Sequence, residues 1–208
     1  GDDFVVLGAD TRLSSGYSIL SRDVSKATVF NDTVMMATGG CRTDVATLQK
    51  VLKVRAAQYH IQHKEHIGCT QTAQLLSTTL YYRRFFPYYA FNIVAGIDSE
   101  GKGGVFTYDA IGFVPFVHYC GVCVVLHYCG VCVVPQLTRR FPAVSFRSFE
   151  RTTYAAQGSG QKLTIPVLDN LIGYKNREQE APKLTVEETV IVCFSVVPIT
   201  QCIHRICS

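Results

Sequence analysis

The stretch that most constrains the fold runs from Tyr81 to Gly112. It reads YYRRFFPYYAFNIVAGIDSEGKGGVFTYDAIG. Arg83 and Arg84 followed by Pro87 indicate the end of a helix, because basic residues suit a last turn and Pro cannot continue it. Two strand-like runs follow, separated by a short Gly-containing loop. They are Phe91–Ile97 and Gly103–Tyr108. The chain is therefore predicted to pass from a helix directly into a β-hairpin.

Aromatic residues crowd the junction between this helix and the hairpin. Phe85, Phe86, Tyr88 and Tyr89 lie within five positions of one another. We expect these rings to pack the junction, each burying about 150 Å² or more.

The sequence before Tyr81 predicts strands followed by two helices. The expected strands are Phe4–Ala9, Tyr17–Leu20, Ala27–Phe30 and Thr33–Thr38. Thr43 and Asp44 offer an N-cap for a helix that ends between His60 and His63, and a second helix starts near Thr70. Strands, then helices, then strands indicate an α+β domain with helices grouped on one side of a sheet.

The sequence after Gly158 predicts one further helix and announces another. Gly158, Ser159 and Gly160 precede KLTIPVLDNLIGYKN, which has helical spacing. Thr185 and Glu188 then form a capping box. The residues after Val190 are β-branched and include Pro198, so we expect the announced helix not to form and residues 191–208 to be an aberrant tail.

The positive charge is concentrated in two unusual segments, Phe113–Arg147 and Ile191–Ser208. Both lack Asp, Glu and Lys and together hold four Arg. All 16 acidic residues and the other 16 of the 20 Lys and Arg lie elsewhere. Four scattered Arg do not make the basic stripe that binds phosphates, so we expect no nucleic-acid partner.

The nine cysteines follow the same division. Only Cys41 and Cys69 lie outside the two unusual segments. An odd number of cysteines and an acidic start without an apolar leader indicate a reduced intracellular protein rather than a disulfide framework.

A perfect duplication marks the first unusual segment, because residues 118–125 and 127–134 both read HYCGVCVV. Cys120, Cys123, Cys129 and Cys132 have the ligand chemistry of a zinc or iron–sulfur site. Only five residues separate the two pairs, however, whereas zinc ribbons place about 15–20 between them. The surrounding valines also favour an extended strand over a metal-binding turn.

This segment could also be a membrane-spanning helix, a redox dithiol, or a stretch with no function in the fold. Phe113–Val134 has the length and neutrality of a membrane-spanning helix, but it contains Pro115 and two His. A redox dithiol would require a helix start at CGVC, and none is visible. We favour the hypothesis that residues 113–147 are a foreign insert, because packing does not require literal repetition.

Without that insert, the flanking sequence continues as YDAIG followed by SFERTTYAAQGSG. Together with GADTRLSSGYSILSRDVSK, RRFFPYY and GKGGVFTYDAIG, this sequence resembles the beta subunits of the eukaryotic 20S proteasome, the beta type-1 group in particular. The resemblance covers Gly1–Gly112 and Ser148–Val190, which we expect to form a single beta-type domain. It implies the N-terminal-nucleophile hydrolase fold, a four-layer αββα sandwich with two antiparallel sheets between helix layers, here incomplete at both ends.

The resemblance also implies where a family active site would lie. In catalytic members an N-terminal Thr attacks the peptide, supported by an Asp and a Lys. Asp10 and Lys26 match those two positions, and Ser159 matches a serine that backs the nucleophile. The sequence begins at Gly1, and Thr11 and Thr28 are internal, so we expect no nucleophile and only vestigial site residues. No cofactor and no metal are implied.

The resemblance implies a non-catalytic structural subunit of the beta ring. Its expected partners are the other alpha and beta subunits of a twenty-eight-subunit particle, which degrades ubiquitin-marked proteins with ATP in the cytoplasm and nucleus. We expect no membrane partner. Two alternatives stay open. One is a catalytic threonine protease subunit whose N-terminal Thr is missing from this sequence. The other is a metal-binding or membrane-anchored protein that uses the CGVC repeats.

Overall fold

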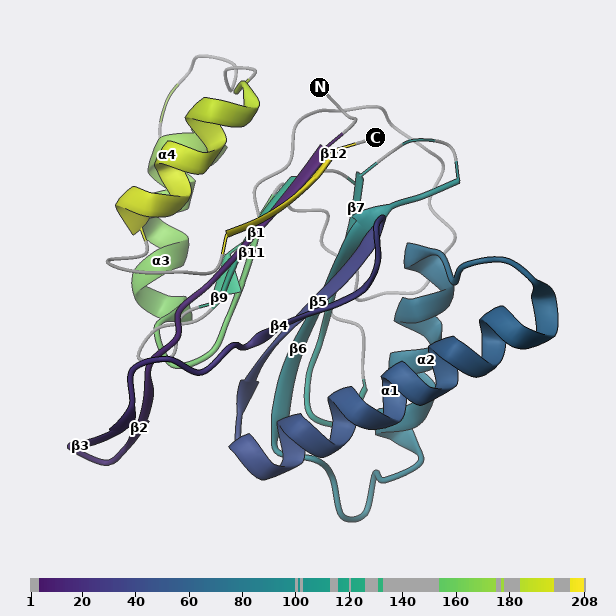
Figure 1. Cartoon of the computed structure of the whole chain (residues 1–208). Helices are drawn as coiled ribbons and strands as arrows, with labels where there is room; N and C mark the ends of the chain where they lie inside the picture. The colour runs from purple at the N-terminus through teal and green to yellow at the C-terminus, as the bar shows by residue number, and fades with distance from the viewer. Residues whose placement is uncertain are drawn as a thin grey trace.

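The computed structural model describes residues 4–99, 101, 103–112, 116–119, 121–125, 131–132, 154–174, 177, 184–196 and 203–207. Within them the chain is a mixed α+β protein with two main sheets and one small hairpin. Figure 1 shows α1 and α2 on one side and α3 and α4 on the other, beside the sheet that contains β1.

The larger regular sheet has the strand order β4-β5-β6-β7-β8 and is antiparallel throughout. Its strands are β4 (Ala27–Asn31), β5 (Val34–Gly40), β6 (Ala90–Ile97), β7 (Gly103–Tyr108) and β8 (Phe116–Tyr119). The predicted hairpin of β6 and β7 is confirmed, since Ile97 pairs with Gly103. The expected strands Ala27–Phe30 and Thr33–Thr38 correspond to β4 and β5, which also form a hairpin, with Asn31 paired with Val34.

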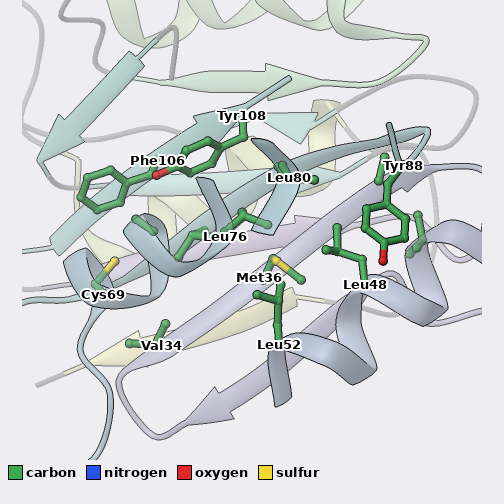
Figure 2. Close-up of a cluster of buried hydrophobic side chains, with 14 residues drawn as sticks. Val34, Met36, Leu48, Leu52, Cys69, Leu76, Leu80, Tyr88, Phe106 and Tyr108 are labelled. Atoms are coloured by element: carbon green, nitrogen blue, oxygen red, sulfur yellow. The ribbon is translucent and has the colours of Figure 1, made fainter. Parts of the chain in front are cut away.

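Helices α1 (Arg42–His63) and α2 (Cys69–Tyr81) cover one face of this sheet. Val34 and Met36 of β5 point into a buried cluster with Leu48 and Leu52 of α1 and with apolar residues of α2, as Figure 2 shows. The apolar residues that alternate along the strand therefore pack against the apolar residues that recur about every 3.6 positions along the helix.

The second sheet has the order β10-β9-β1-β12, and β11 also pairs with β9. Its strands are β1 (Phe4–Ala9), β9 (Gly121–Val125), β10 (Val131–Cys132), β11 (Ala155–Gln157) and β12 (Ile203–Cys207). The expectation of two antiparallel sheets is wrong for this one, because β9 runs parallel to both β1 and β11. The chain between β1 and β9 includes both α1 and α2, and parallel neighbours need such long connections.

The side chains of β1 alternate between two cores. Val5, Leu7 and Ala9 pack against β5, β6 and β7 of the other sheet. Phe4 and Val6 pack on the opposite face, in a cluster that includes Leu168 and Cys193. A strand buried on both faces explains why FVVLGA reads as a continuous apolar run rather than an alternating one.

The helix after Thr185 forms, so the expectation that it would not is wrong. Glu188 accepts hydrogen bonds from the Thr185 backbone and hydroxyl at 2.8 and 3.1 Å, and Thr185 Oγ1 accepts the Glu188 N–H at 3.3 Å. Helix α4 then runs from Val186 to Val196, before Pro198. β-Branched residues cost only about 0.7 kcal/mol each in a helix. Tertiary packing offsets that cost, because Cys193 is buried in the cluster with Phe4 and Val6, and Val190 and Val192 pack against the same cluster.

Two predicted helix boundaries differ from the structure. Helix α1 begins at Arg42 with Cys41 as N-cap, because the Asp44 carboxylate accepts the Tyr89 N–H instead of capping its own helix. Helix α2 ends at Tyr81, and Arg83 lies in the tight turn that follows.

The helix predicted after Gly160 is also interrupted. Helix α3 covers Gln161–Leu168 and contains Pro166, and a π-helical turn, Asp169–Gly173, replaces its continuation. Pro has no N–H for the helical ladder, and such local widening is one response to a ladder that is broken.

Both unusual segments contribute strands. β8, β9 and β10 lie within residues 113–147, and β12 lies within 191–208. The spanning-helix alternative for Phe113–Val134 is wrong, because strands lie where it needs a continuous helix. Among the described residues, no helix combines the length and apolar character that a bilayer crossing requires. The foreign origin of the two segments stays a prediction.

The aromatic junction is not packed as expected. Tyr88 is buried, but Tyr81, Tyr82, Phe85, Phe86 and Tyr89 are exposed, and we call these five residues the aromatic patch. The turn after α2 is too short to fold its own rings inward, since Arg83 N–H and Arg84 N–H bond back only three residues. Tyr88 alone reaches the cluster between α1 and α2 (Figure 2).

Candidate functional site

A buried ion pair joins the end of β1 to the start of β4. Asp10 follows the last residue of β1, and Lys26 precedes the first residue of β4. The hairpin β2 (Leu13–Ser15) and β3 (Ser18–Ser21) carries the chain out and back between them, and Val24 N–H donates to the Thr11 carbonyl at its base. Lys26 Nζ therefore lies 2.6 Å from Asp10 Oδ1 although sixteen positions separate the residues.

Further hydrogen bonds hold Lys26 in place. Lys26 Nζ also donates to the Arg12 carbonyl at 2.7 Å. The Lys26 carbonyl accepts the Thr38 N–H at 3.0 Å, which ties it to β5. Both side chains are nearly inaccessible to water, with Asp10 8% and Lys26 4% exposed. The amine is thus fixed in position rather than free to sample rotamers.

Burial shifts both titrations toward the neutral forms. Desolvation lowers the pKa of Lys26 to about 8, although the Asp10 charge acts in the opposite direction. Desolvation likewise raises the pKa of Asp10, against the charge of Lys26. A lysine with a pKa near 8 can accept or donate a proton near neutral pH. A lysine with an ordinary pKa stays protonated there. The pair therefore has the chemistry of a proton-holding or charge-stabilising group.

The topology brings the Ser159 turn to the same sheet edge as Asp10. Ala9, Val125 and Gln157 end β1, β9 and β11 in matched register, and these three strands are parallel. Asp10 follows Ala9, and the exposed Ser159 lies in the turn after Gln157. Two strand spacings correspond to roughly 10 Å. Asp10 and Ser159 thus lie at one end of this sheet, and Lys26, which precedes β4 of the other sheet, contacts Asp10 there.

The neighbouring threonines are engaged in internal bonds. Thr11 is buried and its hydroxyl donates to the Arg22 carbonyl at 2.7 Å. Thr28 is a buried residue of β4. Both have an ordinary backbone amide on either side, so neither offers a free amine as base.

The duplicated cysteines divide between described and undescribed positions. Cys123 lies in β9 and Cys132 in β10, and the two strands pair with Cys132 opposite Val124. Cys120 and Cys129 lie outside the described residues. Gly121 to Cys123 is extended, as the valine content predicts, whereas a metal-binding CxxC pair needs a turn. Within the described part of the chain, no cluster of three or more His, Cys, Asp or Glu could hold a metal ion.

Sequence reasoning missed the residues that support the pair from α1. Gln49 Nε2 donates to Thr38 Oγ1 at 2.6 Å, and Thr38 is itself bonded to Lys26. The signal was present, because Gln49 lies four residues after the buried Val45 and so shares its helix face. A polar residue on a buried helix face is expected to form a hydrogen bond there.

The chain is similar to several known proteins. The sequence profile described as "Proteasome subunit" matches residues 1–122. A relative from Arabidopsis thaliana, "Proteasome subunit beta type-1", is 45% identical over 170 residues, which is 82% of this chain and 60% of the relative. Relatives of the same name from Drosophila melanogaster and Danio rerio are 40% and 36% identical. They align over 92% and 91% of this chain and over 68% and 66% of their own lengths.

The chain spans about three fifths of the length of the curated plant relatives that it matches. Within that span the match includes the strand ends that carry Asp10 and Lys26, the two helices, and the hairpin of β6 and β7. The chain therefore belongs to the proteasome subunit family.

Proposed function

We propose that this chain is a non-catalytic structural subunit of the beta ring of the 20S proteasome core. The observation that carries the proposal is the match to beta type-1 subunits, up to 45% identical, over most of the chain. Its partners would be the other alpha and beta subunits of the core particle, working in the cytoplasm and nucleus. The assembled particle, rather than this chain alone, would degrade proteins.

We also propose that the chain has the four-layer architecture of the family. Three separate buried clusters support a four-layer αββα sandwich. One lies between the two sheets, one between β5 and helices α1 and α2, and one between β1 and helices α3 and α4. Three successive apolar interfaces are what four layers require.

A structural rather than catalytic role is supported by the state of the ion pair. Lys26 uses its amine on Asp10 and on the Arg12 carbonyl, and Thr11 uses its hydroxyl on the Arg22 carbonyl. These bonds tie the end of β1 to the start of β4 and to the base of the β2–β3 hairpin. Asp10, Lys26 and Ser159 are accordingly proposed as vestigial family positions that now stabilise the sheet end.

The domain division also stays a proposal. We propose that residues 1–112 and 148–190 form one beta-type domain, interrupted by 113–147 and followed by an atypical tail. The family profile ends at residue 122, soon after the first unusual segment begins, which supports a boundary there. Transcripts in which the codons for Gly112 and Ser148 are adjacent are expected. HYCGVCVV peptides in purified particles would contradict this division.

Replacement in cells tests the proposed function. A eukaryotic cell depleted of its own beta type-1 subunit should regain growth and clear ubiquitin conjugates when this chain is expressed. Asp10→Asn with Lys26→Met should restore growth nearly as well, because the pair has no chemical step to perform. Restoration by the parent chain but not by the double variant, at equal abundance, would favour the catalytic alternative.

A further inference from the structure

The aromatic patch is a large apolar surface that the described chain leaves uncovered. Tyr81, Tyr82, Phe85, Phe86 and Tyr89 are between 61% and 94% exposed. They occupy the end of α2 and the loop that leads to β6, at the lower edge of Figure 1. Single exposed aromatics need no explanation, but five of them within nine positions of the chain indicate a binding surface.

The backbone under the patch is fixed at both ends. Tyr89 N–H donates to Asp44 Oδ2 at 3.0 Å, and the Tyr89 carbonyl accepts the Cys41 N–H at 2.8 Å. Tyr88 is inserted into the cluster between α1 and α2. The exposed rings are therefore presented on a rigid support, which lowers the entropic cost of binding.

Two arginines give the patch a positive charge. Arg84 lies over the Phe85 ring at 5.7 Å and the Tyr81 ring at 6.0 Å, and Arg83 lies over Tyr88 at 4.9 Å. Among the described residues, no carboxylate pairs with either guanidinium. The Asp44 carboxylate lies beside the patch, where it accepts the Tyr89 N–H. Two guanidinium groups against one carboxylate leave an excess of positive charge, which carboxylates of a partner would complement.

The size of the patch corresponds to one side of a stable interface. Five aromatic side chains at these exposures would bury roughly 700 Å² on contact. A standard interface buries about 800 Å² per partner, whereas the largest apolar patch of a typical monomer is about 300–600 Å².

We propose that the aromatic patch binds an acidic, apolar-edged surface of a neighbouring, non-identical subunit, an inference that rests on the proposed function. Carboxylates of that subunit pair with Arg83 and Arg84, and its aliphatic side chains cover Phe85 and Phe86. A second copy of this chain is disfavoured as the partner. A two-fold contact through the patch would bring the same arginines of both copies together.

The proposal is tested by replacing Phe86 with a photo-crosslinking amino acid in the whole chain and irradiating purified particles that contain it. The expected result is a crosslink to an Asp- or Glu-bearing segment of a different subunit. A crosslink to a second copy of this chain, or no crosslink in particles that contain the chain, overturns the proposal and leaves the proposed function standing. Failure of the parent chain to enter any particle overturns the proposed function as well.

Matched substitutions supply an independent readout. Phe85→Ser with Phe86→Ser, and separately Arg84→Glu, should lower recovery of the chain in particles at least tenfold. Tyr17→Ser alters an equally exposed aromatic on the β2–β3 hairpin and should change recovery less than twofold. Each variant should unfold at nearly the same temperature as the parent chain, since all the altered side chains are exposed, and thermal unfolding checks this. Equal recovery of all variants contradicts the proposal.

Discussion

Lys26 Nζ lies 2.6 Å from Asp10 Oδ1, and both residues are buried. Asp10 directly follows β1 and Lys26 directly precedes β4, and these two strands lie in different sheets. The ion pair thus links the two sheets at one end.

Loss of one partner should therefore destabilise the chain strongly. Lys26→Met leaves the Asp10 carboxylate buried and unpaired, which costs about 3–5 kcal/mol. Urea unfolding followed by far-UV circular dichroism measures this, since the chain has no Trp for fluorescence. The double variant Asp10→Asn with Lys26→Met should lose less, because no charge stays buried. Equal stability of Lys26→Met and the parent chain would show that the pair is not formed.

The same pair predicts a pH dependence. The folded pKa of Lys26 is about 8 and its ordinary value is 10.5, so between them the folded state holds fewer protons at this site than the unfolded state. The contribution of Lys26 to the free energy of unfolding therefore rises with pH in this window, by up to about 1.4 kcal/mol per pH unit. Below about pH 8 both states are protonated and the contribution is constant.

The measurement is the difference in unfolding free energy between the parent chain and Lys26→Met, taken from about pH 7 to about pH 10. The parent chain should gain on the variant as the pH rises. A difference that stays flat through this range would mean that burial does not depress the pKa of Lys26.

Gly112 follows the hairpin of β6 and β7, lies against α2 and should not tolerate a side chain. Its φ is +83°, and a Cβ there would lie 2.7 Å from the Ser77 carbonyl oxygen and 2.8 Å from Leu80 Cβ. Gly112→Ala should destabilise the chain by about 1–3 kcal/mol from backbone strain, with the steric clash in addition. Gly16→Ala is the matched control, because φ is +57° and nothing lies within 4 Å of its Cβ position. Equal losses in the two variants would contradict the close packing at Gly112.

Cysteine reactivity should separate the surface from the core. Cys41 is exposed, and hydrogen bonds from Thr43 Oγ1 and from nearby backbone N–H groups lower the pKa of its thiol. Burial raises the pKa of Cys69 and Cys193. Iodoacetamide should modify Cys41 roughly tenfold or more faster than the other two.

Peptide mapping by mass spectrometry gives the rates, and the same reaction in urea is the control in which all three thiols should react alike. Rapid native labelling of Cys193 would contradict the packing of α4 on β1.

Much of the fold could be predicted from local patterns. β6 and β7 followed from Gly-containing loop spacing, and α1 followed from Val45, Leu48 and Leu52 at helical intervals. Helix α4 could not be predicted in full, because its stability depends on burying Cys193 against β1, far away in sequence. The exposure of Phe85 and Phe86 was also beyond local reasoning. Aromatic residues serve cores and interfaces equally well, and only the tertiary structure shows which applies.

Only part of the candidate site could be predicted from the sequence. Asp10 and Lys26 were identified through the family resemblance, and their contact depends on the return of the β2–β3 hairpin. Thr38 and Gln49, which support the pair, come from a second strand and a helix. Helical spacing from Val45 places Gln49 on the buried face of α1, but its contact with Thr38 depends on how α1 packs against β5, which spacing along the chain does not indicate.

The most direct test of a non-catalytic place in the beta ring combines composition and labelling. Particles purified through a tag on this chain would be treated with a fluorescent active-site-directed threonine protease probe and then quantified by mass spectrometry. The account predicts that this chain is present in equal amount with the other beta subunits and carries no probe, while catalytic subunits of the same particles are labelled. Probe attached to this chain, or purification of the chain without alpha and beta partners, would contradict it.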